Sequence, residues 1–226
     1  FYPAMQAADI FSVSKVNKRV LSQHIDSIEH GRNTGFILAE SVKEAGAIGT
    51  LINHSEHRIS KRMIKDVVKR CRELKMLSIV CVKSAREGKK IIKFKPDVIA
   101  YEEPRLIAGK IPITNLTKKI RKFIKIIRKR DKRIKILCGA GISKPEDFKI
   151  ALKEGYNGVL ISSAIMQTKN PARLLKEFAV LVHSENFVAC GVYASIFATV
   201  IFFTLPYHVG FMAVAAGIGG LAGALM

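Results

Sequence analysis

The chain has 226 residues, with 38 lysines and arginines against 18 aspartates and glutamates, and a formal net charge of +20 at pH 7. This length is enough for one complete α/β core, or for one domain with an appendage. The four cysteines lack the spacing of metal ligands or of a disulfide framework, which predicts reduced, buried thiols and excludes a cysteine-based metal site.

Strand-like and helix-like segments alternate from the first residue onward. Short apolar segments predict strands at residues 1–6, 20–26, 46–52, 76–82, 98–102, 134–138 and 158–162. Amphipathic or capped segments predict helices at residues 36–45, 61–75, 85–93, 117–130, 145–154 and 171–181. Repeated strand–helix units with apolar strands indicate a parallel sheet covered by helices, either a closed barrel or an open doubly wound sheet. No glycine-rich loop follows the first strand, which weakens the open, nucleotide-binding alternative.

The most informative segment is 46–58, GAIGTLINHSEHR, in which a buried strand ends in a polar cluster. In parallel barrels the carboxyl end of the strand carries the chemistry. Ser55 and Glu56 predict a helix that begins directly after His54. The positive end of that helix would keep the imidazole neutral and able to donate a hydrogen bond to a carbonyl oxygen. The plainer alternative is a histidine satisfied by backbone groups in a loop.

Two late loops have the composition of phosphate-binding loops. Gly139, Gly141 and Ser143 follow one strand, and Ser162 and Ser163 follow the next. Glycines allow backbone N–H groups to approach phosphate oxygens, and serines add hydroxyls, although a tight strand-to-helix turn would explain either loop alone.

A third polar group ends the strand at residues 98–102. Glu102 is followed by a loop that opens with Pro104 and ends near Gly109, a pattern typical of a lid with a stiff start and a pliant end. The alternative is an ordinary loop with a solvated pair of glutamates.

Four motifs together resemble triosephosphate isomerase of the compact archaeal type: GTLINHSEHR (49–58), AYEEPRLI (100–107), LCGAGIS (137–143) and GVLISS (158–163). They occur in the family's order and spacing between about residues 1 and 182. The resemblance implies an α/β fold, a TIM (β/α)8-type barrel. It also implies a glycolytic and gluconeogenic isomerase without cofactor or metal, which interconverts dihydroxyacetone phosphate and D-glyceraldehyde 3-phosphate through an enediolate.

The resemblance also implies individual roles. Glu102 would be the catalytic base, and neutral His54 would polarise the carbonyl. Ile107 in the lid would approach the substrate, and Gly141, Ser162 and Ser163 would hold its phosphate. The implied partners are the triose phosphate and further copies of the chain in a cytoplasmic homo-oligomer, by resemblance a tetramer.

Two features of the barrel depart from the family pattern. Glu103 replaces a proline beside the base, and Ala108-Gly109-Lys110 replaces the family's lid end, which would slow lid closure or shift the pKa of the base. The family's first strand, with an Asn and a catalytic Lys, has no counterpart before Phe1. We therefore expect a barrel of strands two to eight over residues 1–182, from a longer gene product, with impaired or no activity. Glu56 would lose that lysine as its partner.

No aspartate, glutamate, lysine or arginine follows Glu185, and residues 187–207 and 209–226 are long apolar segments separated by a proline region. They predict a second region, 183–226, that forms an apolar helical hairpin resembling transmembrane helices. Three explanations stay open: a genuine membrane hairpin with membrane contact through residues 187–226, an artificial join, and a buried extension.

Three other functions compete with this isomerase. One is a different phosphate-binding barrel isomerase, from pentose or tryptophan metabolism, and another is a non-catalytic, membrane-attached phosphate-binding barrel. The third is nucleic-acid binding through residues 118–135, where the basic residues concentrate. Aromatic residues do not alternate with these charges, so we attribute them to solvated helix faces and expect no nucleic-acid partner.

Overall fold

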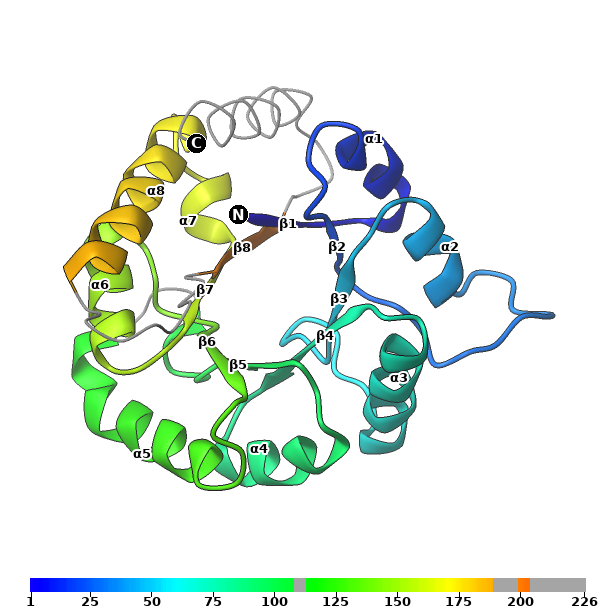
Figure 1. Ribbon diagram of the computed structural model, residues 1–226, viewed down its shortest axis with the longest axis horizontal. Helices are drawn as coiled ribbons and strands as arrows, with labels where there is room; N and C mark the ends of the chain where they lie inside the picture. The colour runs from blue at the N-terminus through cyan, green and yellow to red at the C-terminus, as the bar shows by residue number, and fades with distance from the viewer. Residues whose placement is uncertain (108–112, 189–198, 204–226) are drawn as a thin grey trace.

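The computed structural model describes residues 1–107, 113–188 and 199–203, which form a closed barrel of parallel strands in the order β1 to β8 (Figure 1). The strands are β1 (Tyr2–Met5), β2 (Leu21–Ser22), β3 (Gly49–Ile52), β4 (Leu77–Val82), β5 (Val98–Tyr101), β6 (Lys135–Cys138), β7 (Gly158–Ile161) and β8 (Thr199–Phe203). The predicted TIM-type barrel of parallel strands is confirmed, and the seven predicted strands form in the predicted order.

Helices surround the strands as an outer ring (Figure 1). They are α1 (Ile10–Ser14), α2 (Ala39–Glu44), α3 (Lys61–Glu73), α4 (Ala85–Ile91), α5 (Thr117–Arg128), α6 (Pro145–Lys153), α7 (Ser163–Met166) and α8 (Pro171–Val188). Short 3-10 helices lie at η1 (Ala7–Asp9), η2 (Ile92–Phe94) and η4 (Ile113–Leu116).

Strands β1 to β7 are largely buried on both faces, as expected of a parallel sheet enclosed by helices. One apolar cluster fills the inside of the barrel and takes residues from successive strands: Ala4, Leu21, Leu51, Ile79, Cys81, Ala100, Leu137 and Leu160. A larger cluster lies between strands and helices and includes the fully buried Phe123, Phe148 and Phe178. Cys71, Cys81 and Cys138 are buried free thiols, as predicted, and Cys190 lies outside the described residues.

The helices are held by local sequence signals. In α3, the Ser60 hydroxyl accepts a hydrogen bond from the Met63 backbone N–H and caps the helix. Ile64, Val67, Val68 and Cys71 then recur at helical spacing and form the buried face. Helix α4 begins in the same way, with the Ser84 side chain accepting from the Glu87 N–H.

The C-terminal region differs from the predicted helical hairpin where the structure describes it. Helix α8 continues to Val188, and Thr199–Phe203 is a strand that pairs in parallel with β7 and β1. A barrel open between β7 and β1 would present two unpaired strand edges, and the β-branched and aromatic sequence of β8 suits a strand that covers both. Residues 189–198 and 204–226 lie outside the described residues.

Two consequences follow for the sequence-based expectations. Strand β8 occupies the position between β7 and β1, and its sequence, TVIFF, contains neither the Asn nor the Lys that the resemblance implies for a first strand. Among the described residues, no helix combines the length and the apolar character needed to cross a bilayer, so the predicted membrane contact gains no support.

The closing strand can be tested at Ile201, whose backbone pairs with Tyr2 and Leu160. In Ile201→Pro the backbone N–H is lost from the ladder, so we expect the free energy of unfolding to fall by about 2 kcal/mol or more. The matched control is Ile201→Val, which keeps the N–H and should unfold almost as the original chain does. Equal stability of the proline variant and the original chain in denaturant titrations would show that β8 does not close the barrel.

Candidate active site

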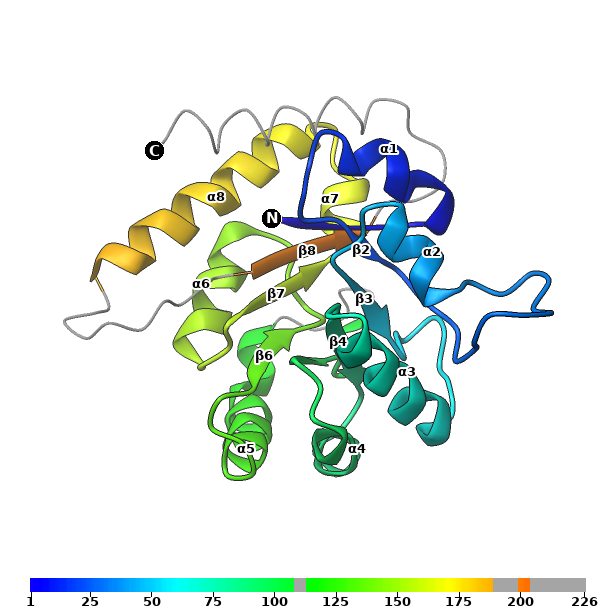
Figure 2. The ribbon, with the colours of Figure 1, turned by 45° about the vertical axis from the view of Figure 1, so that its right-hand side comes forward.

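The predicted site residues lie at one rim of the barrel because each follows the carboxyl end of a parallel strand. His54 follows β3, Glu102 follows β5, Gly141 follows β6, and Ser162 and Ser163 follow β7. Figure 2 shows these strands obliquely, with the helices outside them. The structure therefore brings four segments that are far apart in the sequence to the same end of the barrel.

Glu102 is the most buried charged side chain of this rim, with a relative exposure of 1%. Its Oε2 accepts a hydrogen bond from Arg58 Nη2 at 2.9 Å, and His54 Nε2 lies 3.1 Å from its Oε1. The approach of His54 lacks hydrogen-bond alignment, so Oε1 is a buried oxygen without a hydrogen-bond partner among the described residues. An unsatisfied buried carboxylate oxygen is costly, and it is available to accept a proton.

Burial raises the pKa of Glu102 to about 7, and the charge of Arg58 acts against this rise. Removal from water disfavours the ionised carboxylate, whereas the guanidinium favours it. The two effects leave a carboxyl group that changes its protonation state near neutral pH. Such a group is suited to act as a general base.

His54 is held as a neutral imidazole with a defined tautomer. Burial lowers its pKa below the usual value, the Glu56 carboxylate opposes this, and the charge of Arg58 adds to it. The backbone N–H of Glu56 donates to His54 Nδ1 at 3.4 Å, so that in the neutral ring the proton is on Nε2, the nitrogen nearest Glu102.

The predicted cause of this neutrality was wrong. Helix α3 begins at Lys61, with Ser60 as its N-cap, and not directly after His54. Residues between β3 and α3 form a loop, in which the His57 N–H donates to the His54 carbonyl. Burial, Arg58 and a single backbone N–H therefore replace the helix terminus as the reasons for the neutral imidazole.

Two residues of this loop were missed as site residues, although both stand in the motif. Arg58 Nη1 donates to the Asn53 carbonyl at 2.8 Å, which fixes its guanidinium beside Glu102. Asn53 has a φ of 62°, its amide donates to the Cys81 carbonyl, and its Oδ1 accepts from the Ile59 N–H. Asparagine tolerates this left-handed conformation better than most residues, which is the signal that could have identified Asn53.

Glu103 does not disturb the base as the sequence suggested. Its buried carboxylate accepts hydrogen bonds from the Tyr101 hydroxyl at 2.5 Å and from Arg105 Nε at 3.1 Å, and Lys119 Nζ lies 2.6 Å away. Although burial acts in the opposite direction, these partners, led by Lys119, lower the pKa of Glu103. Burial, and not Glu103, is the main cause of the raised pKa of Glu102.

The two glycines after β6 lie where a side chain would collide with its neighbours, Gly139 beside Glu102 and Gly141 beside Leu106 of the lid. A Cβ on Gly139 would come within 2.8 Å of Glu102 Cγ, so a larger residue would displace the base. Gly141 has a φ of +79°, and a Cβ there would meet the side chain of Leu106 at 3.1 Å. The start of the lid therefore contacts the loop predicted to hold phosphate.

The structure describes the other predicted site residues, Ile107, Ser162 and Ser163, but only the first part of the lid. Ile107 lies at the end of the described lid and is exposed, whereas residues 108–112 lie outside the described residues. Ser162 precedes the short helix α7, and its carbonyl accepts from the Ile165 and Met166 N–H groups. Ser163 is the first residue of α7 and is exposed. Within the described part of the chain, no three His, Cys, Asp or Glu side chains gather as metal ligands would.

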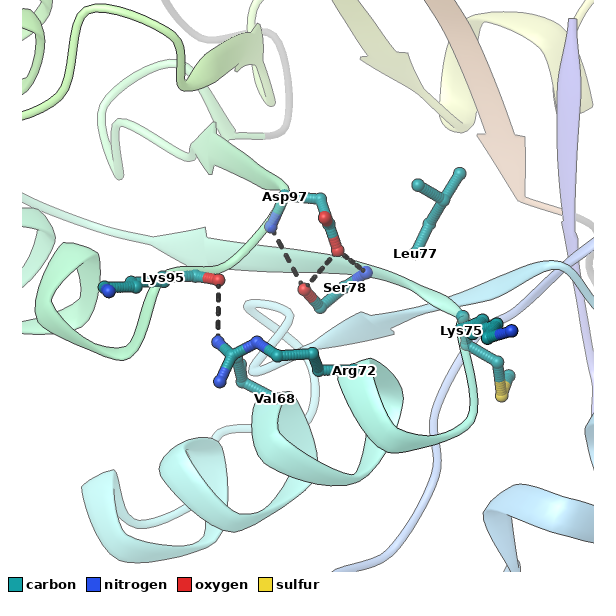
Figure 3. Close-up of a pocket in the computed structure, with 8 residues that line it drawn as sticks. Val68, Arg72, Lys75, Leu77, Ser78, Lys95 and Asp97 are labelled. Atoms are coloured by element: carbon teal, nitrogen blue, oxygen red, sulfur yellow. Dashed lines mark hydrogen bonds between the residues drawn. The ribbon is translucent and has the colours of Figure 1, made fainter.

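A cavity of about 230 Å³ lies at the opposite end of the barrel, at the amino ends of β4 and β5 (Figure 3). There, Asp97 Oδ2 accepts from both the backbone N–H and the hydroxyl of Ser78, and Arg72 donates to the Lys95 carbonyl. These bonds tie two strands and a helix together. The cavity is distant from the rim that carries His54 and Glu102 because it lies at the other ends of the same strands.

Comparisons with known proteins agree with this arrangement. The family model for triosephosphate isomerase matches residues 1–182. The chain belongs to the triosephosphate isomerase family. It is 41% identical over 166 residues to the triosephosphate isomerase of Methanocaldococcus jannaschii, covering 73% of this chain and 76% of that one. It is 40% identical over 174 residues to that of Methanobrevibacter smithii, covering 76% and 78%.

A solved structure shows the same fold. The crystal structure of triosephosphate isomerase from Bartonella henselae superposes with a TM-score of 0.53 and 22% identity, covering 70% of this chain and 76% of that one. At this identity the likeness bears on the fold alone. The predicted resemblance to the family is confirmed.

The position of Arg58 generates a prediction for this family member. In Arg58→Met the guanidinium is lost, so the pKa of Glu102 should rise above about 7, and the acidic limb of the pH profile of isomerase kcat/KM should move to higher pH. At pH 6.5 we expect kcat/KM to fall about ten-fold, which corresponds to about one pH unit.

The matched control is Arg58→Lys, which keeps the charge and should retain most of the original profile. An acidic limb that stays in place in the methionine variant would contradict the role assigned to Arg58.

Proposed function

We propose that this chain interconverts dihydroxyacetone phosphate and D-glyceraldehyde 3-phosphate, with Glu102 as the catalytic base and His54 as the group that polarises the carbonyl. The observation that supports this most is the pair itself. A desolvated carboxyl group with a pKa of about 7 has one unpartnered oxygen, and a neutral imidazole nitrogen lies 3.1 Å from that oxygen.

The proposed reaction moves one proton between two neighbouring carbons and one proton between the oxygens that these carbons carry. Glu102 Oε1 accepts the proton from the carbon next to the carbonyl, which leaves an enediolate, and returns it to the other carbon. His54 Nε2–H donates a hydrogen bond to the carbonyl oxygen and stabilises the negative charge that develops there. It gives its proton to that oxygen and takes back the proton of the neighbouring hydroxyl, so that carbonyl and hydroxyl exchange places. A neutral imidazole is suited to this role. The pKa for loss of its N–H proton is closer to the pKa of an enediol than the pKa of an imidazolium is.

The phosphate is assigned to the loops after β6 and β7. Gly141 lies in the first loop, in a conformation that suits glycine, and Ser162 and Ser163 lie at the start of α7. Backbone N–H groups in such loops, together with the serine hydroxyls, form a binding site for phosphate oxygens. Ile107 would cover the substrate when the lid closes, which would keep water from the enediolate.

The burial of Glu102 argues against the non-catalytic alternative. Because its pKa is higher in the folded chain than in the unfolded chain, ionisation of Glu102 opposes folding as the pH rises from about 4.5 toward 7. The difference corresponds to about 3 kcal/mol. A barrel without this reaction gains nothing from keeping such a group, whereas an isomerase needs it.

The assembly and the location are assigned by resemblance to the archaeal-type family. The proposed assembly is a homo-oligomer, a tetramer, and the proposed location is the cytoplasm. The substrate is a small triose phosphate, as the family implies.

Two neighbouring buried glutamates provide the test. In Glu102→Gln the base is lost, so kcat/KM should fall at least 1,000-fold in a coupled isomerase assay, while the free energy of unfolding at pH 8 should rise by about 2 kcal/mol. In the control, Glu103→Gln, a carboxylate with a lowered pKa is lost. Activity should largely remain, because Glu103 contacts Tyr101, Arg105 and Lys119 and is not the base. The free energy of unfolding at pH 8 should fall by about 2 kcal/mol, because an ionised, paired carboxylate is lost. A Glu102→Gln variant that retains turnover would refute the proposed function.

A further inference from the structure

The net charge of the chain comes almost entirely from one continuous part of the sequence. Residues 61–135 contain 26 of the 38 lysines and arginines but only 7 of the 18 aspartates and glutamates, which is +19 of the total of +20. Residues 1–60 are neutral, with six charges of each sign. A composition rich in lysine would raise the charge of every segment, so it does not explain this asymmetry.

The fold places this part of the sequence on one side of the barrel. Helices α3, α4 and α5 follow one another along the ring, and α4 and α5 lie side by side in both views (Figures 1 and 2). Gly88 allows these two helices to approach closely, since a Cβ there would meet Ile127 Cδ1 at 2.7 Å. The outer faces of α4 and α5 therefore form one continuous surface.

Each helix presents a stripe of cations on this surface. The stripe of α5 is Lys118, Lys122, Lys125 and Lys129, and the stripe of α4 and η2 is Arg86, Lys89, Lys90 and Lys93. All eight side chains are exposed, and among the described residues none has an ion-pair partner. By contrast, Lys119 and Arg121 of α5 are paired with Glu103 and Glu154. We call the eight unpaired cations the basic face.

The basic face costs stability within the chain. Like charges at i and i+4, such as Lys118 with Lys122, destabilise a helix, and no acidic side chain in the part of the chain that the structure describes forms an ion pair with the basic face. A second copy of the same face would add repulsion, so this surface is poorly suited to self-association. Binding of a partner with high negative charge would remove the repulsion among these cations.

The other side chains of the face limit the choice of polyanion. Among the described residues, no large exposed hydrophobic residue lies on α4 or α5, so the face lacks the apolar groups that insert into a bilayer and the aromatic groups that stack on single-stranded bases. The stripe of α5 extends over about 18 Å, the length of twelve helical residues. Duplex nucleic acid presents about ten phosphate charges over that length.

We propose that the basic face of α4 and α5 binds the phosphate backbone of double-stranded nucleic acid without sequence preference. This departs from the expectation of no nucleic-acid partner, which rested on the lack of aromatic residues among the charges, a criterion for binding single strands. The surface is separate from the rim that carries His54 and Glu102, so the binding does not depend on the proposed isomerase activity.

The test compares three full-length proteins by fluorescence anisotropy with a 24-base-pair DNA duplex of arbitrary sequence, between 50 and 300 mM KCl. The first is the original chain. In the second, Lys118, Lys122, Lys125 and Lys129 are replaced by Gln. The third is a control with the same change of net charge outside the basic face, on α6, on α8 and in the segment between α7 and α8, in which the exposed Lys149, Lys153, Lys169 and Lys176 are replaced by Gln. Thermal unfolding of all three checks that they fold.

We expect the original chain to bind with an affinity that falls steeply with salt. The α5 variant should lose at least ten-fold in affinity at 50 mM KCl, and the slope of log K against log salt should decrease by about 3, since each lost phosphate contact removes about 0.9. The control should bind as the original does. Equal losses in both variants would overturn the proposal, because net charge alone would then explain binding. Absence of DNA binding would overturn it too, as would binding to phosphatidylserine vesicles alone.

Discussion

The carboxyl group of Glu102 is removed from water at the rim of the barrel, and the arrangement of the surrounding residues follows from the cost of keeping it there. Burial raises its pKa to about 7, and the guanidinium of Arg58 has the largest effect among the groups that limit the rise. The same burial lowers the pKa of His54 and keeps that imidazole neutral. A base that ionises near neutral pH and a neutral hydrogen-bond donor thus arise from one cause, which is the exclusion of water.

The rest of the fold keeps these groups in position. Asn53, in a left-handed conformation at the end of β3, ties the loop of His54 and Arg58 to β4. Gly139 leaves the space that Glu102 occupies. Glu103 is next to the base in sequence but is neutralised by Lys119, Arg105 and the Tyr101 hydroxyl. Closure of the barrel by β8 completes the sheet that carries all four loops.

The sequence predicted those features that follow from local patterns. Apolar segments identified the strands that form the barrel, and polar residues directly after these strands identified His54 and Glu102. The start of α3 was misplaced because Ser55 and Glu56 have the composition of a helix start, whereas Ser60 is the residue whose side chain caps the helix. The strand β8 was taken for part of a membrane helix because it lies within a long uncharged apolar segment, and that length outweighed the β-branched and aromatic residues of β8 itself. Its pairing with β1 depends on residues nearly 200 positions away.

Contacts between residues far apart in the sequence were the other features that the sequence did not predict. The ion pair of Arg58 with Glu102 joins residues 44 positions apart, and no spacing rule predicts it. The basic face was visible as a charge run in the sequence, but that α4 and α5 combine their charges on one side became evident only from the packing of Gly88 against Ile127.

The central claim is that burial places the ionisation of Glu102 near neutral pH. The most direct measurement is the pH titration of its side-chain carboxyl carbon by ¹³C NMR, with the resonance assigned by its absence in Glu102→Gln. The account predicts a midpoint near pH 7. A midpoint near 4.5, the ordinary value for a solvated glutamate, would show that Glu102 is hydrated and would contradict the account.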